Sequence, residues 1–140
     1  MISIKKPAEI KYLHEILDET DSYLKRHHCP SDFVFEADLV IEELFTNTCY
    51  YAYDGSEEEQ TCEFHLEIDE NNLLIQRIDL GKPFNPLTIA DPDVDQNFRE
   101  RRVGGLGMYL VKHFCSRIEY SYRNNQNILT LYRTIPINTI

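Results

Sequence analysis

The stretch VGGLGMYLV, from Val103 to Val111, places three glycines within four positions, directly before apolar residues at helical spacing. The whole chain has only five glycines. Glycines at the first turn of a helix remove the side chains that would cover its unpaired backbone N–H groups. These groups and the positive end of the helix dipole favour anions such as phosphate. We therefore expect a helix whose first turn, at Gly104, Gly105 and Gly107, binds an anion.

Two arginines, Arg101 and Arg102, stand just before these glycines and would add charge-assisted contacts to a terminal phosphate. The same glycines also suit a flexible hinge beside a closely packed helix. The stretch lacks the Lys-Ser/Thr pair that ends a P-loop, and no strand directly precedes it, as one would in a dinucleotide-binding turn. An anion site of another kind and a hinge are the two interpretations left.

A second cluster lies in EELFTNTCYYAY, where Glu43 and Asn47 stand four residues apart on a predicted helix. At about 100° per residue, they project from one face of that helix, roughly opposite its apolar stripe. A carboxylate beside an amide oxygen suits a hard cation such as Mg²⁺, or the orientation of a nucleophilic hydroxyl. A solvated polar face is the alternative interpretation.

The third cluster is RIDLGKPFNP, in which Asp79 and Gly81 end a predicted strand and lead into Phe84. A carboxylate at the end of a strand accepts a hydrogen bond from an exocyclic amine such as N6 of adenine, and a glycine lets the base approach the backbone. An ordinary turn is the alternative, because Asp, Gly and Pro are also typical turn residues.

The composition indicates a globular protein. Of the 140 residues, 42% are hydrophobic, which is enough for one core, and we expect a single domain over residues 1–140. The formal net charge of -10 makes nucleic acid and anionic membrane surfaces poor partners, because both would repel the chain. A nucleotide is not excluded, since local dipoles and a bound cation outweigh net charge at short range.

The four cysteines are far apart and form no C-x-x-C pair. They have the number needed for two disulfides, but the N-terminus has no apolar signal segment and no stretch is long and apolar enough to span a membrane. We therefore expect a cytoplasmic protein with reduced, mostly buried thiols.

Apolar periodicity predicts the helices and strands. We expect strands at 2–5, 61–69, 73–81, 118–123 and 128–134, with helices from about Pro7 to His27, over 33–53 and over 106–118. A polar loop from Pro86 to Val103 is long enough to be functional or mobile. The predicted fold class is an α/β (α+β) two-layer sandwich, in which three helices cover one face of a mixed, largely antiparallel sheet.

In this order, the three clusters resemble the N, G1 and G2 boxes of the GHKL ATPases, the superfamily of gyrase and the histidine kinases. The matching segments are E-x-x-x-N, D-x-G-x-x-F-x-P and G-G-L-G. The short chain, the spelling VGGLGMYLVKHF and the final hairpin are most similar to the bacterial anti-sigma factor serine/threonine kinases. The resemblance spans about Ile2 to Arg133 and implies the Bergerat ATP-binding fold of that superfamily.

The resemblance implies ATP and Mg²⁺ as cofactors and assigns roles to the matching positions. Glu43 would be the general base, Asn47 the Mg²⁺ ligand and Asp79 the residue that binds adenine. Gly81, Phe84 and the phosphate-binding turn of Gly104, Gly105, Leu106 and Gly107 would complete the nucleotide site, with Arg101 and Arg102 as candidates for the terminal phosphate. The loop from about Leu87 to Val103 would be the lid.

Two positions depart from the pattern of the family. Many relatives have a histidine four residues after the asparagine, whereas this chain has Tyr51, which takes up no proton near neutral pH. Position 83 is proline where some relatives have glycine, and this restrains the turn before Phe84.

The resemblance implies a protein serine/threonine kinase that phosphorylates an anti-anti-sigma partner of the STAS type. Binding of a sigma factor and a homodimer are also expected. The alternative is a non-catalytic module in which bound ATP orders the lid and so selects a protein partner. A histidine-kinase catalytic domain fits less well, since no helix with a phosphoacceptor precedes Ile2.

Overall fold

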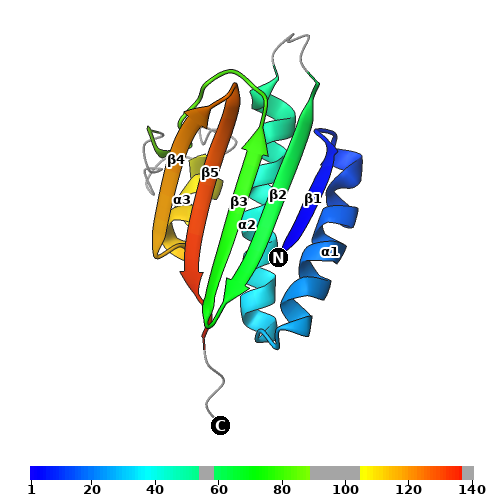
Figure 1. Ribbon diagram of the computed structural model, residues 1–140, viewed down its shortest axis with the longest axis vertical. Coiled ribbons are helices and arrows are strands. Elements are labelled where there is room, and N and C mark those ends of the chain that lie inside the picture. The colour runs from blue at the N-terminus through cyan, green and yellow to red at the C-terminus, as the bar shows by residue number, and fades with distance from the viewer. Residues whose placement is uncertain (54–58, 89–104, 137–140) are drawn as a thin grey trace.

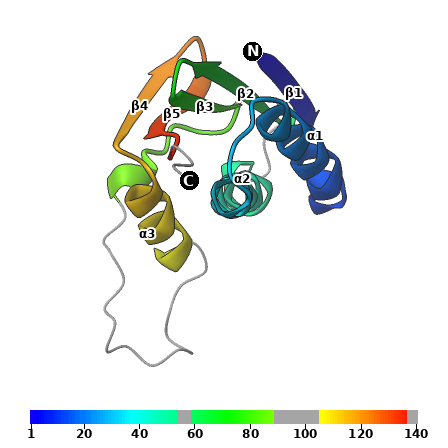
Figure 2. The same ribbon diagram turned by 90° about the horizontal axis from the view of Figure 1, so that it is seen from below.

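The computed structural model describes residues 1–53, 59–88 and 105–136 of the chain. Within these residues, a five-stranded sheet forms one layer and three α-helices form the other (Figure 1). The helices all lie on the same face of the sheet, as the view from below shows (Figure 2). The predicted two-layer sandwich is confirmed.

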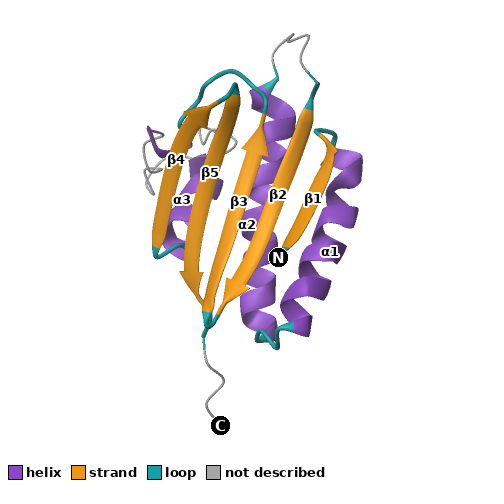
Figure 3. Cartoon of the chain, viewed as in Figure 1, coloured by secondary structure: helices purple, strands orange, loops and turns teal. Residues whose placement is uncertain are grey.

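The strands are paired in the order β1-β2-β3-β5-β4, and each of the four pairings is antiparallel (Figure 3). Side chains alternate between the two faces of each strand. The face toward the helices is therefore apolar over most of its area. The strands are β1 (Ile2–Pro7), β2 (Thr61–Asp69), β3 (Asn72–Asp79), β4 (Arg117–Arg123) and β5 (Gln126–Thr134).

Tight turns connect β2 to β3 and β4 to β5, which form two hairpins. Glu70 lies between β2 and β3 and has a left-handed φ of 56°, while Asn124 and Asn125 join β4 to β5 with φ values of 52° and 62°. Asparagine tolerates this region of backbone space, and two such residues in succession suit a hairpin turn. The second turn is thus two residues long, shorter than NNQN suggested, and Asn127 belongs to β5.

The helical layer contains α1 (Leu13–Arg26), α2 (Ser31–Asn47) and α3 (Gly105–Phe114). A 3-10 turn at Ile10–Tyr12 precedes α1, and a π-helical turn at Thr48–Ala52 continues α2, so the predicted second helix forms over nearly its full length. Pro7 is the last residue of β1 and lies outside the first helix, which begins later than its sequence suggested.

The third helix is shorter than predicted, because it ends at Phe114 rather than near Ile118. The reason is competition from the sheet. Ser116 donates hydrogen bonds from both its backbone N–H (2.8 Å) and its hydroxyl (3.0 Å) to the carbonyl oxygen of Tyr132 on β5. The Arg117 guanidinium lies 4.0 Å from the centroid of the Tyr132 ring. These contacts draw the chain into β4.

The core lies between the sheet and α2, the central helix. The fully buried side chains of α2 include Ile41, Leu44 and Phe45, and these belong to the same buried cluster as Phe64 of β2 and Ile75 of β3. Each such side chain contributes roughly 1.5–3 kcal/mol when it leaves water. Packing of α2 on the sheet therefore fixes the position of every residue that α2 carries.

The four cysteines, all in the described residues, are free thiols, as expected. Cys62 is buried, and the other three are partly buried. None of the helices in the described ranges combines the length and hydropathy that crossing a membrane requires.

Two carboxyl groups meet at the α1–α2 interface. Asp21 of α1 and Asp38 of α2 hydrogen bond to each other, and the Oδ1 atom of each is buried without a partner. Desolvation by burial, together with the hydrogen bond and negative charge of Asp21, raises the pKa of Asp38 to about 8; Lys25 opposes this rise and Glu42 adds to it. The folded state therefore holds a proton that the unfolded chain releases at much lower pH.

The end of α2 also meets the end of β3. A Cβ atom added at Gly81 would overlap the backbone carbonyl of Ala52, which cannot move without the helix, and would lie 2.9 Å from its Cβ. The tyrosine hydroxyl of Tyr53 accepts hydrogen bonds from the N–H groups of Leu80 (2.8 Å) and Thr61 (3.2 Å) and joins the ends of β3 and β2. The helix end and the strand ends therefore form one rigid unit.

We predict that the free energy of unfolding falls as pH rises from about 4 toward 8. Because the pKa of Asp38 is raised on folding, its stabilising contribution is complete below the unfolded value near 4 and is lost as pH passes the folded value of about 8. Asp38→Asn should flatten this slope and stabilise the protein at pH 8 by on the order of 1 kcal/mol, after allowance for solvent screening. Urea denaturation at several pH values measures the effect. The exposed Asp18 on α1 gives the control, because Asp18→Asn should leave the slope unchanged.

We predict that Gly81→Ala destabilises the fold by roughly 1–3 kcal/mol, since the new methyl group meets main-chain atoms rather than a mobile side chain. Thermal or urea denaturation measures this change. A Gly81→Ala protein as stable as the wild type would contradict the close contact between Gly81 and Ala52.

Candidate functional site

The glycine cluster before α3 and the cluster of Glu43 and Asn47 meet at one contact. A Cβ atom added at Gly107, in the first turn of α3, would overlap the side-chain carbon and both oxygens of the Glu43 carboxylate. The carboxylate therefore lies directly against the backbone of α3. The face of α2 that carries Glu43 avoids the main core, as predicted, but α3 covers it in part instead of leaving it in water.

This position changes the acidity of Glu43. Desolvation by burial raises the pKa of its carboxyl group; a hydrogen bond with the Asn47 side chain lowers it, and the charge of Glu42 raises it. The net direction is upward. One oxygen, Oε1, is buried and has no hydrogen-bond partner among the residues that the structure describes. A desolvated carboxylate with an unused acceptor, held by a neighbouring amide, is a suitable proton acceptor for a bound hydroxyl.

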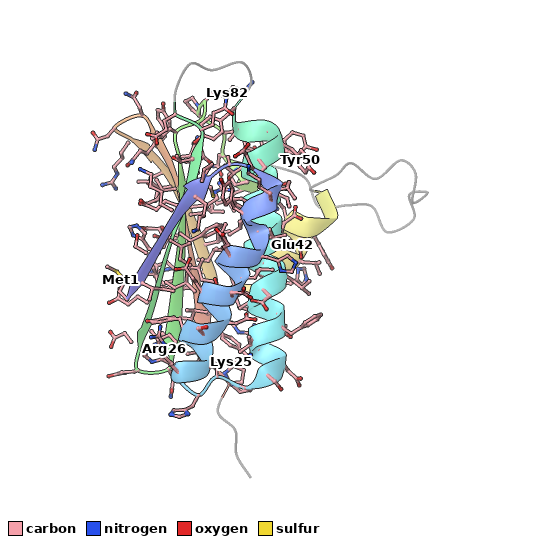
Figure 4. All side chains as sticks on the ribbon, turned by 90° about the vertical axis from the view of Figure 1, so that its right-hand side faces the viewer. Met1, Lys25, Arg26, Glu42, Tyr50 and Lys82 are labelled. Carbon is pink, nitrogen blue, oxygen red and sulfur yellow. The ribbon has the colours of Figure 1, made fainter. Side chains whose placement is uncertain are left out.

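Asn47 ends the α-helical part of α2, and the π-helical turn begins at the next residue. Such turns occur often at functional sites. Tyr51, which stands at the position of the family histidine, is 53% exposed and packs edge-on against Tyr50. Figure 4 shows Tyr50 on the side of the helix away from the sheet, at the end of the molecule where Lys82 also lies.

Asp79 is 3% exposed and lies at the end of β3, on the face toward the helices. Its Oδ1 atom accepts hydrogen bonds from the backbone N–H of Gly81 (3.0 Å) and the side-chain amide of Asn127 (2.9 Å). Its Oδ2 atom accepts one from the Thr48 hydroxyl (3.4 Å) and lies 3.8 Å from Nε of Arg77. Because Thr48 follows Asn47, α2 connects the cluster of Asp79 and Gly81 to the cluster of Glu43 and Asn47.

Asn127 of β5 is a site residue that the sequence did not reveal. It is buried, and its amide nitrogen donates to Asp79 as well as to the carbonyl oxygens of Gly81 (3.1 Å) and Lys82 (2.9 Å). Its oxygen accepts from the N–H of Phe84 (3.1 Å) and from the Tyr120 hydroxyl. One side chain therefore fixes both the carboxylate and the turn after it. The only signal in the sequence was an asparagine just before the predicted last strand.

Phe84 is placed by its backbone, since its N–H also donates to the Tyr120 hydroxyl (3.2 Å), while its ring is 54% exposed. The backbone contacts hold the turn, and the ring stays at the surface. Its role in nucleotide binding remains a prediction.

Other predicted positions are only partly described. Gly105 and Leu106 begin α3, so two of the three glycines lie in its first turn as predicted. Arg101, Arg102 and Gly104 lie outside the described residues, as does most of the predicted lid. The described part therefore brings Glu43 and Gly107 together at one contact, with Asn47 hydrogen-bonded to Glu43, and α2 links these residues to Asp79 and Gly81.

The residues present fit ATP and Mg²⁺ in their chemistry. Among the described residues, no group of three or more His, Cys, Asp or Glu side chains is arranged to hold a metal alone. Mg²⁺ in nucleotide sites needs only one or two protein oxygens, because phosphates and water supply the rest. The Asn47 amide oxygen would meet that need. Among the described residues, the unpartnered Oε1 of Glu43 leaves one polar atom for a ligand to satisfy.

The chain is similar to several known proteins. The serine-protein kinase RsbW of Staphylococcus aureus is 26% identical over 121 residues, which cover 84% of this chain and 76% of that protein. Two solved structures share the fold. The RsbU and RsbW domains of Rv1364c from Mycobacterium tuberculosis match with a TM-score of 0.68 and 12% identity over 96% of this chain, which spans only 31% of that chain. The SiaB-SiaC complex from Pseudomonas aeruginosa matches with a TM-score of 0.63 and 16% identity over 96% of this chain and 90% of that chain.

The predicted resemblance to the GHKL ATPases is confirmed, because the model of one family within that group matches residues 6–133 and so includes all three clusters. The chain belongs to the histidine kinase-like ATPase domain family.

Proposed function

We propose that this protein is an ATP- and Mg²⁺-dependent serine/threonine kinase that phosphorylates an anti-anti-sigma partner of the STAS type. The observation that carries the proposal is the contact between the Glu43 carboxylate and Gly107. The contact supports the proposal because a partly desolvated carboxylate lies next to the turn proposed to bind phosphate. The similarity to a serine-protein kinase supports the same reaction class.

Each residue then has a physical task. Glu43 accepts the proton of the partner hydroxyl as that oxygen attacks the terminal phosphate, and its raised pKa makes it a stronger base. The amides at the start of α3 bind phosphate oxygens, and Asp79 accepts a hydrogen bond from the adenine amine. A Mg²⁺ ion held by Asn47 would neutralise charge on the phosphates.

The partner interaction follows from charge. A phosphate adds almost two negative charges to the partner at neutral pH. Repulsion from a chain with a net charge of -10 would then favour release of the phosphorylated partner. One protein with this fold, in the SiaB-SiaC complex of Pseudomonas aeruginosa, is bound to a second protein. Binding of a sigma factor, a homodimer, a cytoplasmic location and a single domain over 1–140 stay predictions.

The second candidate is a non-catalytic module that binds ATP and selects a partner without phosphate transfer. Tyr51 favours this candidate, because it stands where many relatives have a histidine and offers no imidazole to exchange a proton. Its side chain is exposed. The two candidates differ in one measurable product, a phosphorylated partner.

We predict that Glu43→Gln lowers phosphate transfer to the partner by about 10²- to 10⁴-fold, because the amide cannot accept the proton. Transfer is measured with labelled ATP and candidate STAS-domain partners, and nucleotide binding by calorimetry should persist. Glu42→Gln is the matched control, since Glu42 is the adjacent glutamate and is exposed. The wild-type rate should also decline on the acid side at a pH above the usual glutamate range. Tight ATP binding without transfer to any partner would favour the module.

We predict that Gly107→Ala lowers transfer at least about tenfold while it changes the free energy of unfolding by less than about 1 kcal/mol. The added methyl group displaces the carboxylate of Glu43, the mobile end of a side chain, so the site changes more than the fold. Comparison of rate and urea denaturation tests this. Equal loss of stability and activity would mean that Gly107 serves packing alone.

A further inference from the structure

Arg77 is the most unusual residue near Asp79, which is proposed to contact the adenine ring. The alternation of β3 puts Leu73, Ile75, Arg77 and Asp79 on the face toward the helices, among apolar neighbours. The arginine is 5% exposed. A buried guanidinium is costly unless its five N–H groups find acceptors.

The protein does not supply those acceptors in full. The Nη1 atom donates one long hydrogen bond, of 3.4 Å, to the carbonyl oxygen of Leu44 on α2. The Nε atom is buried and has no hydrogen-bond partner in the described part of the chain. The nearest carboxylate oxygen, Oδ2 of Asp79, is 3.8 Å from Nε, which is too far for a hydrogen bond.

The two oxygens of Asp79 are unequally used. Oδ1 accepts short hydrogen bonds from Gly81 and Asn127. From the described residues, Oδ2 accepts only the 3.4 Å bond from Thr48. A spare acceptor and an unused donor thus lie 3.8 Å apart on neighbouring inward positions of one strand.

The donor of Arg77 and the acceptor of Asp79 match the hydrogen-bonding groups on one edge of adenine. Adenine presents an exocyclic amine, which donates, next to a ring nitrogen, which accepts. We propose that Arg77 donates a hydrogen bond to a ring nitrogen beside the amine, N1 or N7, while Oδ2 of Asp79 accepts from the amine. In the same orientation, guanine would place its carbonyl oxygen against the Asp79 carboxylate and be repelled. Arg77 is then a residue that determines base specificity, and this inference rests on the proposed function.

A purely structural role for Arg77, as a counter-ion for Asp79, is the competing explanation. The 3.8 Å separation and the unpaired Nε argue against it, because a buried ion pair offsets its desolvation only with good hydrogen-bond geometry. The two roles differ in one respect. A counter-ion affects every nucleotide equally, whereas a base contact depends on the ring nitrogen.

Calorimetry with Mg²⁺ and ATP, 1-deaza-ATP, 7-deaza-ATP and GTP tests the inference. For the wild type, one of the two deaza analogues should bind about tenfold or more weaker than ATP, since a hydrogen bond from a charged donor is lost. GTP should bind more weakly still. In Arg77→Met, the affinity for ATP should fall to that of the analogue, and the difference in affinity between the two nucleotides should vanish. Arg133→Met is the control, because Arg133 is a partly buried arginine whose hydrogen bonds lie at Phe114 and Thr134, and it should keep the wild-type discrimination.

The outcomes separate the inference from the function on which it rests. Equal binding of ATP and both deaza analogues by the wild type overturns the base contact of Arg77 and leaves the ATP site intact. If Arg77→Met still distinguishes ATP from the deaza analogue as the wild type does, the base contact of Arg77 is likewise overturned and the ATP site stays intact. If Arg77→Met does not fold, Arg77→Lys replaces it, because lysine keeps the positive charge and the aliphatic stem but has a methylene in place of the Nε–H group. A wild type that binds no adenine nucleotide overturns the proposed function, and the inference with it.

Discussion

The site depends on two places where a helix approaches a backbone that has no side chain. At one of them, the carboxylate of Glu43 occupies the space that a Cβ of Gly107 would fill. At the other, the carbonyl of Ala52 does the same at Gly81. Both approaches involve α2 and its π-helical continuation, so the central helix is fixed against α3 and against β3 at the same time. Packing to this closeness leaves little freedom for the polar groups between.

Hydrogen bonds make the end of the sheet as fixed as the helix. Asn127 connects Asp79 to the backbone of the turn that follows β3, and the hydroxyl of Tyr53 joins the ends of β2 and β3. A carboxylate held from several directions keeps one orientation, which a residue proposed to recognise a base requires. Positioning of this kind matters more than flexibility, because phosphate transfer depends on geometry and charge rather than on covalent chemistry by the protein.

Much of this was predictable from the chain. The four-residue spacing of Glu43 and Asn47 and the glycines before α3 are local patterns, and the helices and strands follow from apolar periodicity. Asn127 and Arg77 were not predictable, because their roles depend on neighbours far away in sequence. The turn residues Asn124 and Asn125 obscured Asn127, and the two charged residues of RID do not reveal from sequence which groups Arg77 meets. The early end of α3 at Phe114 has a similar cause, since the carbonyl of Tyr132 decides it from another strand.

Buried polar groups without hydrogen bonds lower the stability of the fold, so their positions indicate where residues serve another purpose, such as ligand binding. Within the described residues, the buried side-chain atoms without a hydrogen-bond partner belong to four residues: Asp21, Asp38, Glu43 and Arg77. The two aspartates share a hydrogen bond at the α1–α2 interface, whereas Glu43 and Arg77 have an unused acceptor and an unused donor. Glu43 faces α3, and Arg77 binds the carbonyl of the next residue, Leu44. A ligand that formed hydrogen bonds with both Glu43 and Arg77 would therefore contact one turn of α2 from two sides. Those hydrogen bonds would remove the cost of leaving the two groups unpaired and would strengthen binding of the ligand.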